Sequence, residues 1–301
     1  MALRGRVDLV PPQGLILIGI ASVQFGAAFA AKLFDRAGPG GVVLMRLVFS
    51  AVVLLALTRP DLRGRSRREL LTAAGFGLVL GGMNWSFYQA LQLLPLGAAV
   101  TLEFAGPLAV AILGSRRLLD LLWVALAGGG VVLLAFGRSD GSAHSLNPRG
   151  VLLALLAGTL WAGYIVLSQR VGSRFAGLQG LALALSVAGI ALLPVGLIQG
   201  GRALLQPAVF GGGLLVALLS SLIPYSLELI ALRRLRAATF GLLMSLEPAF
   251  AALAGVLVLG EQLRLRTVTA LVMVVAASAG TSLQPGRPAV APVRGDTPPL
   301  G

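Results

Sequence analysis

Cysteine is absent from the 301 residues of the chain, and histidine occurs once, as His144. Without cysteine the chain has no disulfide framework, no thiolate metal site and no thiol nucleophile. A single histidine also excludes a histidine-based metal or catalytic cluster. Because an enzyme acting within a membrane would need such groups, we expect neither an enzyme nor a bound cofactor or metal.

Charge is scarce as well. Charged residues make up 12% of the chain, whereas a typical soluble domain has about 25%. Hydrophobic residues make up 57%, and the mean hydropathy is +0.91. Lys32 is the one lysine, and no glycine-rich phosphate loop ends in a lysine, which argues against direct use of ATP. The composition therefore predicts a protein whose partner is the lipid bilayer.

Apolar runs of membrane-spanning length recur along the chain. A hydrocarbon core about 30 Å thick requires about 20 apolar residues in each crossing helix. The runs cover residues 14–34, 41–58, 70–93, 96–114, 119–137, 150–168, 177–198, 209–232, 238–259 and 266–283. We expect ten transmembrane helices.

A near repetition 141 residues apart relates the two halves. Adding 141 places Pro107 on Pro248 and Asp120 on Glu261 without a gap. Five crossings bring the chain out on the opposite side of the membrane, so the second copy would be inserted upside down, as in many transporters. The predicted fold is an all-α integral membrane protein with ten transmembrane helices, arranged as two inverted five-helix repeats around a central cavity.

The domain organisation follows from these runs. We expect a cytoplasmic N-terminal tail, a first five-helix repeat, a connecting loop, a second five-helix repeat and a disordered cytoplasmic C-terminal tail. Their ranges are 1–13, 14–137, 138–149, 150–283 and 284–301. The last segment holds five prolines and no apolar periodicity, a composition that cannot build a packed core.

Arginine distribution predicts the orientation. With a cytoplasmic N-terminus, sixteen arginines fall in inside segments and six in outside segments. The positive-inside rule then places both termini in the cytoplasm. Because this topology explains the net charge of +13, we expect no nucleic-acid partner. The loops are too short to form an output domain, and no obligate protein partner is indicated.

Four ionisable residues lie inside the apolar runs: Arg46, Glu103, Glu228 and Glu247. Such groups are expensive at membrane depth and usually face a cavity or a partner, so they are candidates for function. The structural alternative is that the glutamates hold helices together or pair with Arg46. We interpret Arg46 itself as a structural counter-charge.

Prolines and polar stripes refine the expected site. A proline leaves the carbonyl four residues before it without its helical donor, and matched interruptions in the two halves mark midplane binding sites. The prolines concerned are Pro107, Pro224 and Pro248. Polar or aromatic residues three or four positions apart share one helix face. The pairs are Asn84 and Tyr88, Trp161 and Tyr164, and Tyr225 and Glu228, and we expect them to converge on one wet cavity.

Several segments carry a resemblance to a known family. They cover residues 95–110, 115–117, 224–228 and 240–249. These segments are similar to those of bacterial threonine and homoserine exporters, which belong to the EamA branch of the drug/metabolite transporter superfamily. The resemblance runs from the first expected helix to the tenth.

The resemblance implies a ten-helix basket with an inner cavity lined mainly by the first, third, fourth, sixth, eighth and ninth helices. It also implies secondary active export of small hydrophilic amino acids, such as threonine and homoserine, across the bacterial inner membrane by antiport with protons. The alternative is export of aromatic amino acids or other drug/metabolite solutes by the same fold, which would require a mainly apolar cavity.

A mechanism can be stated as a hypothesis. Glu103 and Glu247 are the expected proton-coupling residues: one of the carboxylates binds the substrate ammonium from inside, releases it outside and takes a proton in return. The full set of expected substrate-binding residues is Asn84, Tyr88, Glu103, Trp161, Tyr164, Tyr225, Glu228, Ser245 and Glu247.

Overall fold

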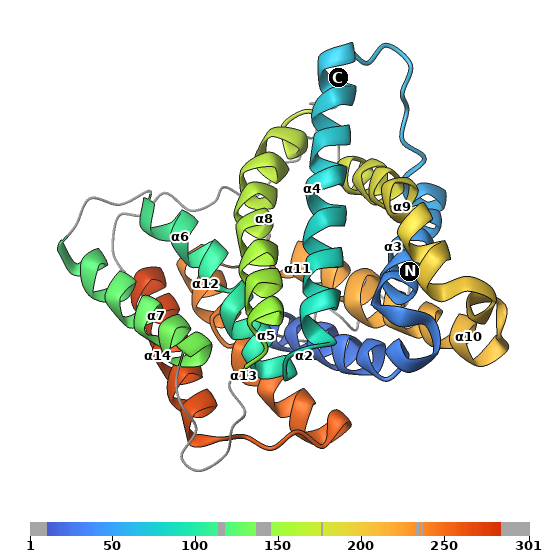
Figure 1. The fold of residues 1–301 in the computed structure, drawn as a ribbon. Coiled ribbons are helices and arrows are strands. Elements are labelled where there is room, and N and C mark those ends of the chain that lie inside the picture. Colours follow the sequence, from blue (N-terminus) through green and yellow to red (C-terminus); the bar gives the residue numbers. More distant parts are fainter. Residues whose placement is uncertain are drawn as a thin grey trace, which may run out of the picture.

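The computed structural model describes residues 11–113, 118–136, 146–175, 177–232, 235 and 237–283. All regular elements in these ranges are helical (Figure 1). The expected C-terminal tail, most of the connecting loop and most of the N-terminal tail lie outside the described residues.

The helices follow the expected apolar runs closely. In the first half they are α2 (Pro12–Ala31), α3 (Phe34–Thr58), α4 (Arg67–Leu91), α5 (Leu96–Glu103), α6 (Ala105–Leu113) and α7 (Leu118–Phe136). In the second half they are α8 (Pro148–Gly172), α9 (Gln179–Gly200), η1 (Gly201–Leu205), α10 (Pro207–Ala217), η2 (Leu218–Leu222), α11 (Ile223–Leu232), α12 (Ala237–Met244), α13 (Glu247–Ala254), η3 (Gly255–Leu259) and α14 (Leu265–Leu283).

Eight helical segments are long and apolar enough to cross a membrane. Two shorter apolar helices, Leu96–Val110 and Leu122–Leu134, coincide with the fourth and fifth expected runs. The described part of the chain is therefore a multi-pass, all-helical membrane protein, as the composition predicts.

The helices are interrupted where the prolines predict it. The fourth run is divided at Phe104, three residues before Pro107, and the ninth is divided at Ser245 and Leu246, just before Pro248. The eighth run widens into the π-helix η2 immediately before Pro224. Each irregularity lies where a proline removes a backbone donor.

The start of α3 differs from the expectation. The apolar run was predicted to begin at residue 41, whereas α3 begins at Phe34 and contains a kink at Gly38, followed by Pro39. Gly38 has φ 62° and ψ 159°, a conformation that glycine adopts readily and other residues rarely do. The kink joins a short polar turn to the apolar helix, which is why hydropathy alone placed the boundary too late.

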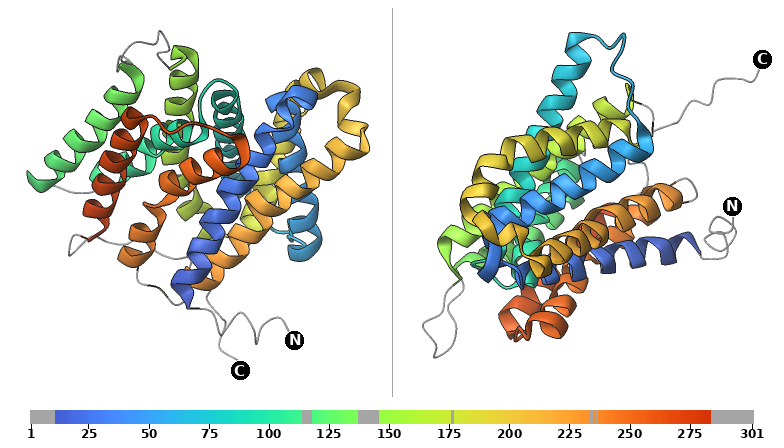
Figure 2. Two further views of the ribbon diagram at one scale, coloured as in Figure 1. Left: turned by 90° about the horizontal axis from the view of Figure 1, so that it is seen from below. Right: turned by 90° about the vertical axis from the view of Figure 1, so that its right-hand side faces the viewer.

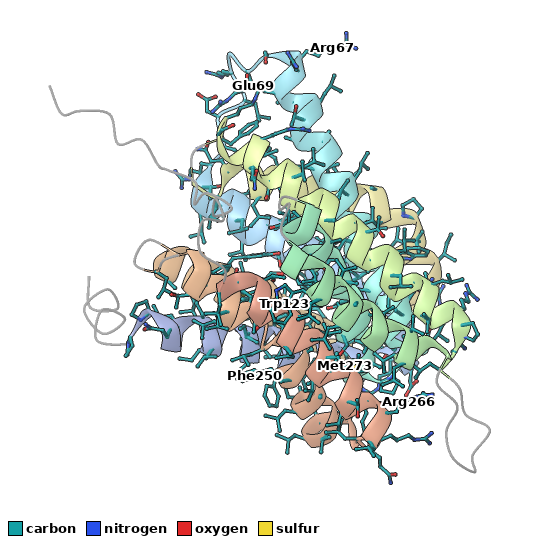
Figure 3. The ribbon with its side chains drawn as sticks, turned by 90° about the vertical axis from the view of Figure 1, so that its left-hand side faces the viewer. Arg67, Glu69, Trp123, Phe250, Arg266 and Met273 are labelled. Atoms are coloured by element: carbon teal, nitrogen blue, oxygen red, sulfur yellow. The ribbon has the colours of Figure 1, made fainter. Side chains whose placement is uncertain are left out.

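Packing between the helices brings the two halves together. Helix α3 of the first half packs on α9 of the second half, and α4 lies between α8 and α9 (Figure 1). Both views in Figure 2 show α2 running beside α10 and α11. At one side of the molecule α7 packs on α14, and Figure 3 places Trp123 and Met273 on these two helices. The Trp123 ring lies directly over Gly280, where a larger residue would not fit.

Candidate functional site

Arg46 of α3 lies at the centre of the candidate site. Its Nε donates to Ser221 Oγ at 3.3 Å and its Nη1 donates to Tyr88 Oη at 3.3 Å. Its Nη2 donates to the carbonyl oxygen of Ser220 at 2.9 Å. That carbonyl is the one that Pro224 leaves without a helical donor. The guanidinium thus satisfies a carbonyl freed by proline in another helix.

The π-helix η2 frees a second carbonyl beside the first. Ile223 N–H donates to the carbonyl of Leu218, so the carbonyl of Leu219 lacks its usual α-helical donor. Ser22 Oγ of α2 donates to it at 2.7 Å. Side chains from α2 and α3 therefore bind two successive carbonyls of η2. π-Helical turns are frequent at functional sites.

The expected ionisable and phenolic residues form one connected group that includes Arg46. Arg46 interacts electrostatically with Glu103 and with two tyrosines, and Glu247 interacts with two other glutamates. Tyr164 interacts with Tyr225 and Glu228. The group comprises Arg46, Tyr88, Glu103, Tyr164, Tyr225, Glu228 and Glu247. Six of the nine expected site residues belong to it.

These side chains differ in exposure. Tyr88 is fully buried, with 0% of its surface exposed, whereas Glu103 retains 8% and Glu247 retains 6%. Arg46, Tyr225 and Glu228 are partly exposed.

Arg46 has no carboxylate counter-ion among the described residues. No Asp or Glu oxygen of the described chain lies within 4.0 Å of its nitrogens. The structural alternative, in which a glutamate pairs directly with Arg46, is therefore not observed.

Glu103 is held at a tight contact between two helices. It is the last residue of α5, and its free carbonyl lies against Gly158 of α8. Gly106 also lies directly against the Gly158 backbone, so a Cβ at either glycine would clash. Phe104 and Trp161 pack edge to face with ring centroids 5.7 Å apart. The break between α5 and α6 therefore packs closely against α8.

Three expected residues have mainly local partners. Asn84 Nδ2 donates to the carbonyl of Leu80 at 2.9 Å, and Ser245 Oγ donates to that of Leu242 at 2.6 Å. Trp161 contacts the site through the ring of Phe104 rather than through a glutamate. Among the described residues, no bond links Asn84 or Ser245 to the three glutamates.

Glu261 contacts a helix far from it in the sequence. Both of its carboxylate oxygens accept from the N–H of Leu96, at 2.9 and 3.1 Å. Leu96 opens α5, and a negative charge at a helix N-terminus is stabilising. Burial raises the pKa of the Glu261 carboxyl, and the bond from Leu96 partly opposes that rise. Asp120, the matching residue in the first half, has its side chain outside the described part.

No group of three or more histidine, cysteine, aspartate or glutamate side chains in the described ranges is arranged to hold a metal ion.

The sequence did not indicate that Arg46 belongs to the site, because a lone cation in an apolar run is readily interpreted as a counter-charge. One signal could have found it: the carbonyl freed by Pro224 requires a donor, and Arg46 is a strong donor at membrane depth.

Comparison with known proteins agrees with this architecture. Residues 148–283 match the EamA-like transporter family. A solved crystal structure covers 88% of this chain and 95% of its own with a TM-score of 0.61 and 17% identity, which shows a shared fold.

Two curated relatives are similar over nearly their whole length. The threonine/homoserine exporter RhtA of Salmonella typhimurium (strain LT2) is 44% identical over 269 residues, 89% of this chain and 90% of the relative. RhtA of Escherichia coli (strain K12) is 43% identical over 273 residues, 90% and 91% of the two chains. The fold is thus that of a membrane transporter rather than an enzyme. The chain belongs to the EamA-like transporter family, in the group that contains the RhtA exporters.

Proposed function

We propose that this protein is a secondary active transporter that exports threonine, homoserine or similar small hydrophilic amino acids across the bacterial inner membrane, by antiport with protons and alternating access. The observation that carries the proposal is the identity of 43–44% to two exporters of threonine and homoserine over about nine tenths of each chain. The chemistry of the site agrees with it.

The site suits a small zwitterion. An amino acid presents one ammonium and one carboxylate, and the cluster holds three glutamates beside a guanidinium and several phenols. A cargo of aromatic amino acids or drug-like solutes would be better served by a mainly apolar lining. The polar character of the cluster favours the hydrophilic cargo.

The glutamates provide a means of coupling to protons. Glu247 lies close enough to Glu103 and Glu228 for their charges to interact, and like charges at close range disfavour full ionisation of all three. Binding of either a proton or a substrate ammonium relieves this repulsion. Because the two cations compete for the same carboxylates, Glu103 and Glu247 would exchange one for the other.

The packing pattern supports two inverted repeats as the basis of alternating access. Under a five-helix repeat, the contact of α4 with α8 has its counterpart in that of α11 with α2, and α6 with α8 corresponds to α13 with α2. The pairs α3 and α9, and α7 and α14, join equivalent helices of the two halves, and the contact of α5 with α13 joins the equivalent fourth and ninth apolar runs. Related contacts of this kind are expected from a pseudo-two-fold axis in the membrane plane.

The ends of the helices support the proposed orientation. Figure 3 shows Arg67 and Glu69 at one end of the molecule and Arg266 towards the opposite end. The first two belong to a segment predicted to be cytoplasmic, and Arg266 to one predicted to be outside. With both termini cytoplasmic, the arginine-rich segment before α4 would face the cell interior.

A panel of radiolabelled amino acids tests the proposal in proteoliposomes, with and without an imposed pH gradient. We expect accumulation of threonine and homoserine against their own gradients only when the pH gradient is present. Accumulation of phenylalanine or tryptophan in preference to threonine would favour the alternative cargo class. Threonine transport that ignores the pH gradient would remove proton antiport.

A further inference from the structure

We propose that Arg46 binds the carboxylate of the transported amino acid while the neighbouring glutamates receive its ammonium group, so that the two ends of the substrate bind groups of opposite charge. This assignment rests on the proposed function, because it concerns the same site. It gives Arg46 a role in specificity.

Arg46 lacks a negatively charged partner among the described residues. Its three bonds within the described chain go to neutral acceptors: the hydroxyls of Ser221 and Tyr88 and the carbonyl of Ser220. A guanidinium at membrane depth is costly without a counter-charge. Removal of that cost requires an anion that the described chain itself does not place within 4.0 Å.

The Arg46 guanidinium has donors that the described residues leave unused. Arginine carries five N–H groups, and Nη1 and Nη2 each have two. Within the described chain each terminal nitrogen of Arg46 makes one bond, to Tyr88 and to Ser220 respectively. One N–H on each is therefore unused by these residues, and a pair of donors on neighbouring nitrogens is suited to a bidentate carboxylate.

The Arg46 guanidinium is accessible and held in one orientation. Its side chain is only partly buried, so a small solute can reach it. The bonds to Tyr88 of α4 and to η2 fix the guanidinium in place without neutralising it. A preoriented arginine loses less entropy on binding than a flexible one.

Carboxylates lie near the Arg46 guanidinium without pairing with it. Glu103 interacts electrostatically with Arg46, and Glu247 interacts with Glu103. The positive and negative ends of the site are therefore neighbours but are not joined in an ion pair. A zwitterion can bridge the two, whereas an amine that lacks a carboxylate leaves the guanidinium unsatisfied.

The test compares L-threonine with L-threoninamide, which keeps the ammonium and the side chain but replaces the carboxylate with a neutral amide. Binding to the purified full chain in detergent is measured by titration calorimetry at a pH where both ligands carry an ammonium. Loss of one partner from a buried charge pair costs at least about 2 kcal/mol, which is about 30-fold in affinity. We expect wild type to prefer threonine by at least about this factor.

Arg46→Gln separates the carboxylate contact from a structural effect. We expect it to lose about 30-fold or more in affinity for threonine and to bind threoninamide about as wild type does, so that the preference disappears. Arg46→Lys keeps the charge without the planar fork and should retain part of the preference. Ser221→Ala is the matched control: it removes one of the three bonds of Arg46, the bonds to Tyr88 and Ser220 still hold the guanidinium, and the preference for threonine should persist.

The outcomes distinguish failure of the role proposed for Arg46 from failure of the proposed function. Equal losses for both ligands in Arg46→Gln, or a preference that survives in it, would overturn the role of Arg46 while leaving threonine export intact. If Arg46→Gln does not fold, equal binding of threonine and threoninamide by wild type alone would overturn the role. Wild type that binds neither ligand would contradict the proposed function itself.

Discussion

At the scale of single residues, buried polar groups in this protein are arranged around backbone groups that lack a helical partner. Arg46 donates to the carbonyl freed by Pro224, Ser22 donates to the neighbouring carbonyl, and Glu261 accepts from the first N–H of α5. In a membrane such groups must be satisfied by protein or by water in a cavity. Side chains that satisfy these backbone groups are thereby held in fixed positions.

The Glu261 carboxyl gives the first prediction, a dependence of stability on pH. Because burial raises its folded-state pKa above the ordinary value near 4.5, the folded state binds the proton more tightly than the unfolded state. The free energy of unfolding should therefore fall as the pH rises from about 4.5 through the raised pKa. Glu261→Gln keeps an acceptor for Leu96 and should flatten this fall, as measured by thermal unfolding in detergent across that range.

The matched comparison is Glu261→Ala, which also removes the acceptor. Relative to Glu261→Gln it should lower stability by about 1 kcal/mol at every pH, as loss of a helix cap does, and it should show the same flattened dependence on pH. If wild type and Glu261→Gln change in parallel across the window, the buried carboxyl is not responsible for the pH effect.

The residue scale also shows what sequence can and cannot predict. Glu103, Glu228 and Glu247 stand out in apolar runs, so their participation in one site could be predicted from hydropathy and helical spacing. The partner of Glu261 could not be predicted, because Leu96 is 165 positions away and the contact depends on how the halves pack. Arg46 was underestimated for the same reason: its partners lie in other helices.

At the scale of helices, the break between α5 and α6 is the element on which Glu103 depends. It lies against α8 because Gly106 and Gly158 permit backbone contact between the helices. Small residues serve this purpose in membrane bundles, where close van der Waals packing replaces the hydrophobic effect. The position of Glu103 is therefore set partly by a residue in another helix.

Gly158→Ala gives the second prediction. Its Cβ would lie much closer to the Glu103 carbonyl oxygen than van der Waals contact allows and would force α5 and α8 apart. Such overpacking typically costs about 1–3 kcal/mol. The apparent unfolding temperature should fall by several degrees, at about 2–4 °C per kcal/mol for a chain of 150–250 residues, and threonine transport should fall with it.

Gly163→Ala in the same helix is the control. A Cβ there meets Val79 at 3.6 Å, which is an ordinary contact, so the change should be neutral or slightly stabilising through helix propensity. Equal effects of the two substitutions would show that the α5–α8 contact does not matter.

Helix positions were predictable and their irregularities only partly so. The apolar runs locate the helices because a hydrocarbon solvent requires continuous apolar stretches, and the three prolines locate the breaks because they lack a donor. The kink at Gly38 was not predicted, because a glycine in a polar turn carries no hydropathy signal. It follows from backbone conformation, which the packing of α3 against Gln199 of α9 fixes.

At the scale of the whole molecule, the orientation in the membrane can be measured directly because the chain contains no cysteine. The third prediction uses single cysteines at two exposed positions, Arg63→Cys before α4 and Gln262→Cys before α14. In intact spheroplasts a membrane-impermeant maleimide should label position 262 and leave position 63 unlabelled until the membrane is opened. Labelling of both positions from the same side would contradict the proposed inverted arrangement.

In the sequence, the proposed repeat rests on the near repetition that aligns Pro107 with Pro248 and Asp120 with Glu261. The packing of one half on the other, such as that of α7 on α14, could not be predicted from it. Contacts between helices depend on complementary surfaces that no single segment contains.

The central claim is that acidic side chains inside the bundle exchange a substrate ammonium for a proton. It is tested most directly by following the internal pH of proteoliposomes with a trapped fluorescent indicator while a threonine gradient is imposed. Wild type should move protons in the direction opposite to threonine. Glu103→Gln together with Glu247→Gln should abolish this proton movement in protein that remains folded. Radiolabelled threonine flux through wild type without any opposing proton flux, or proton coupling that is unchanged in the double variant, would contradict the account.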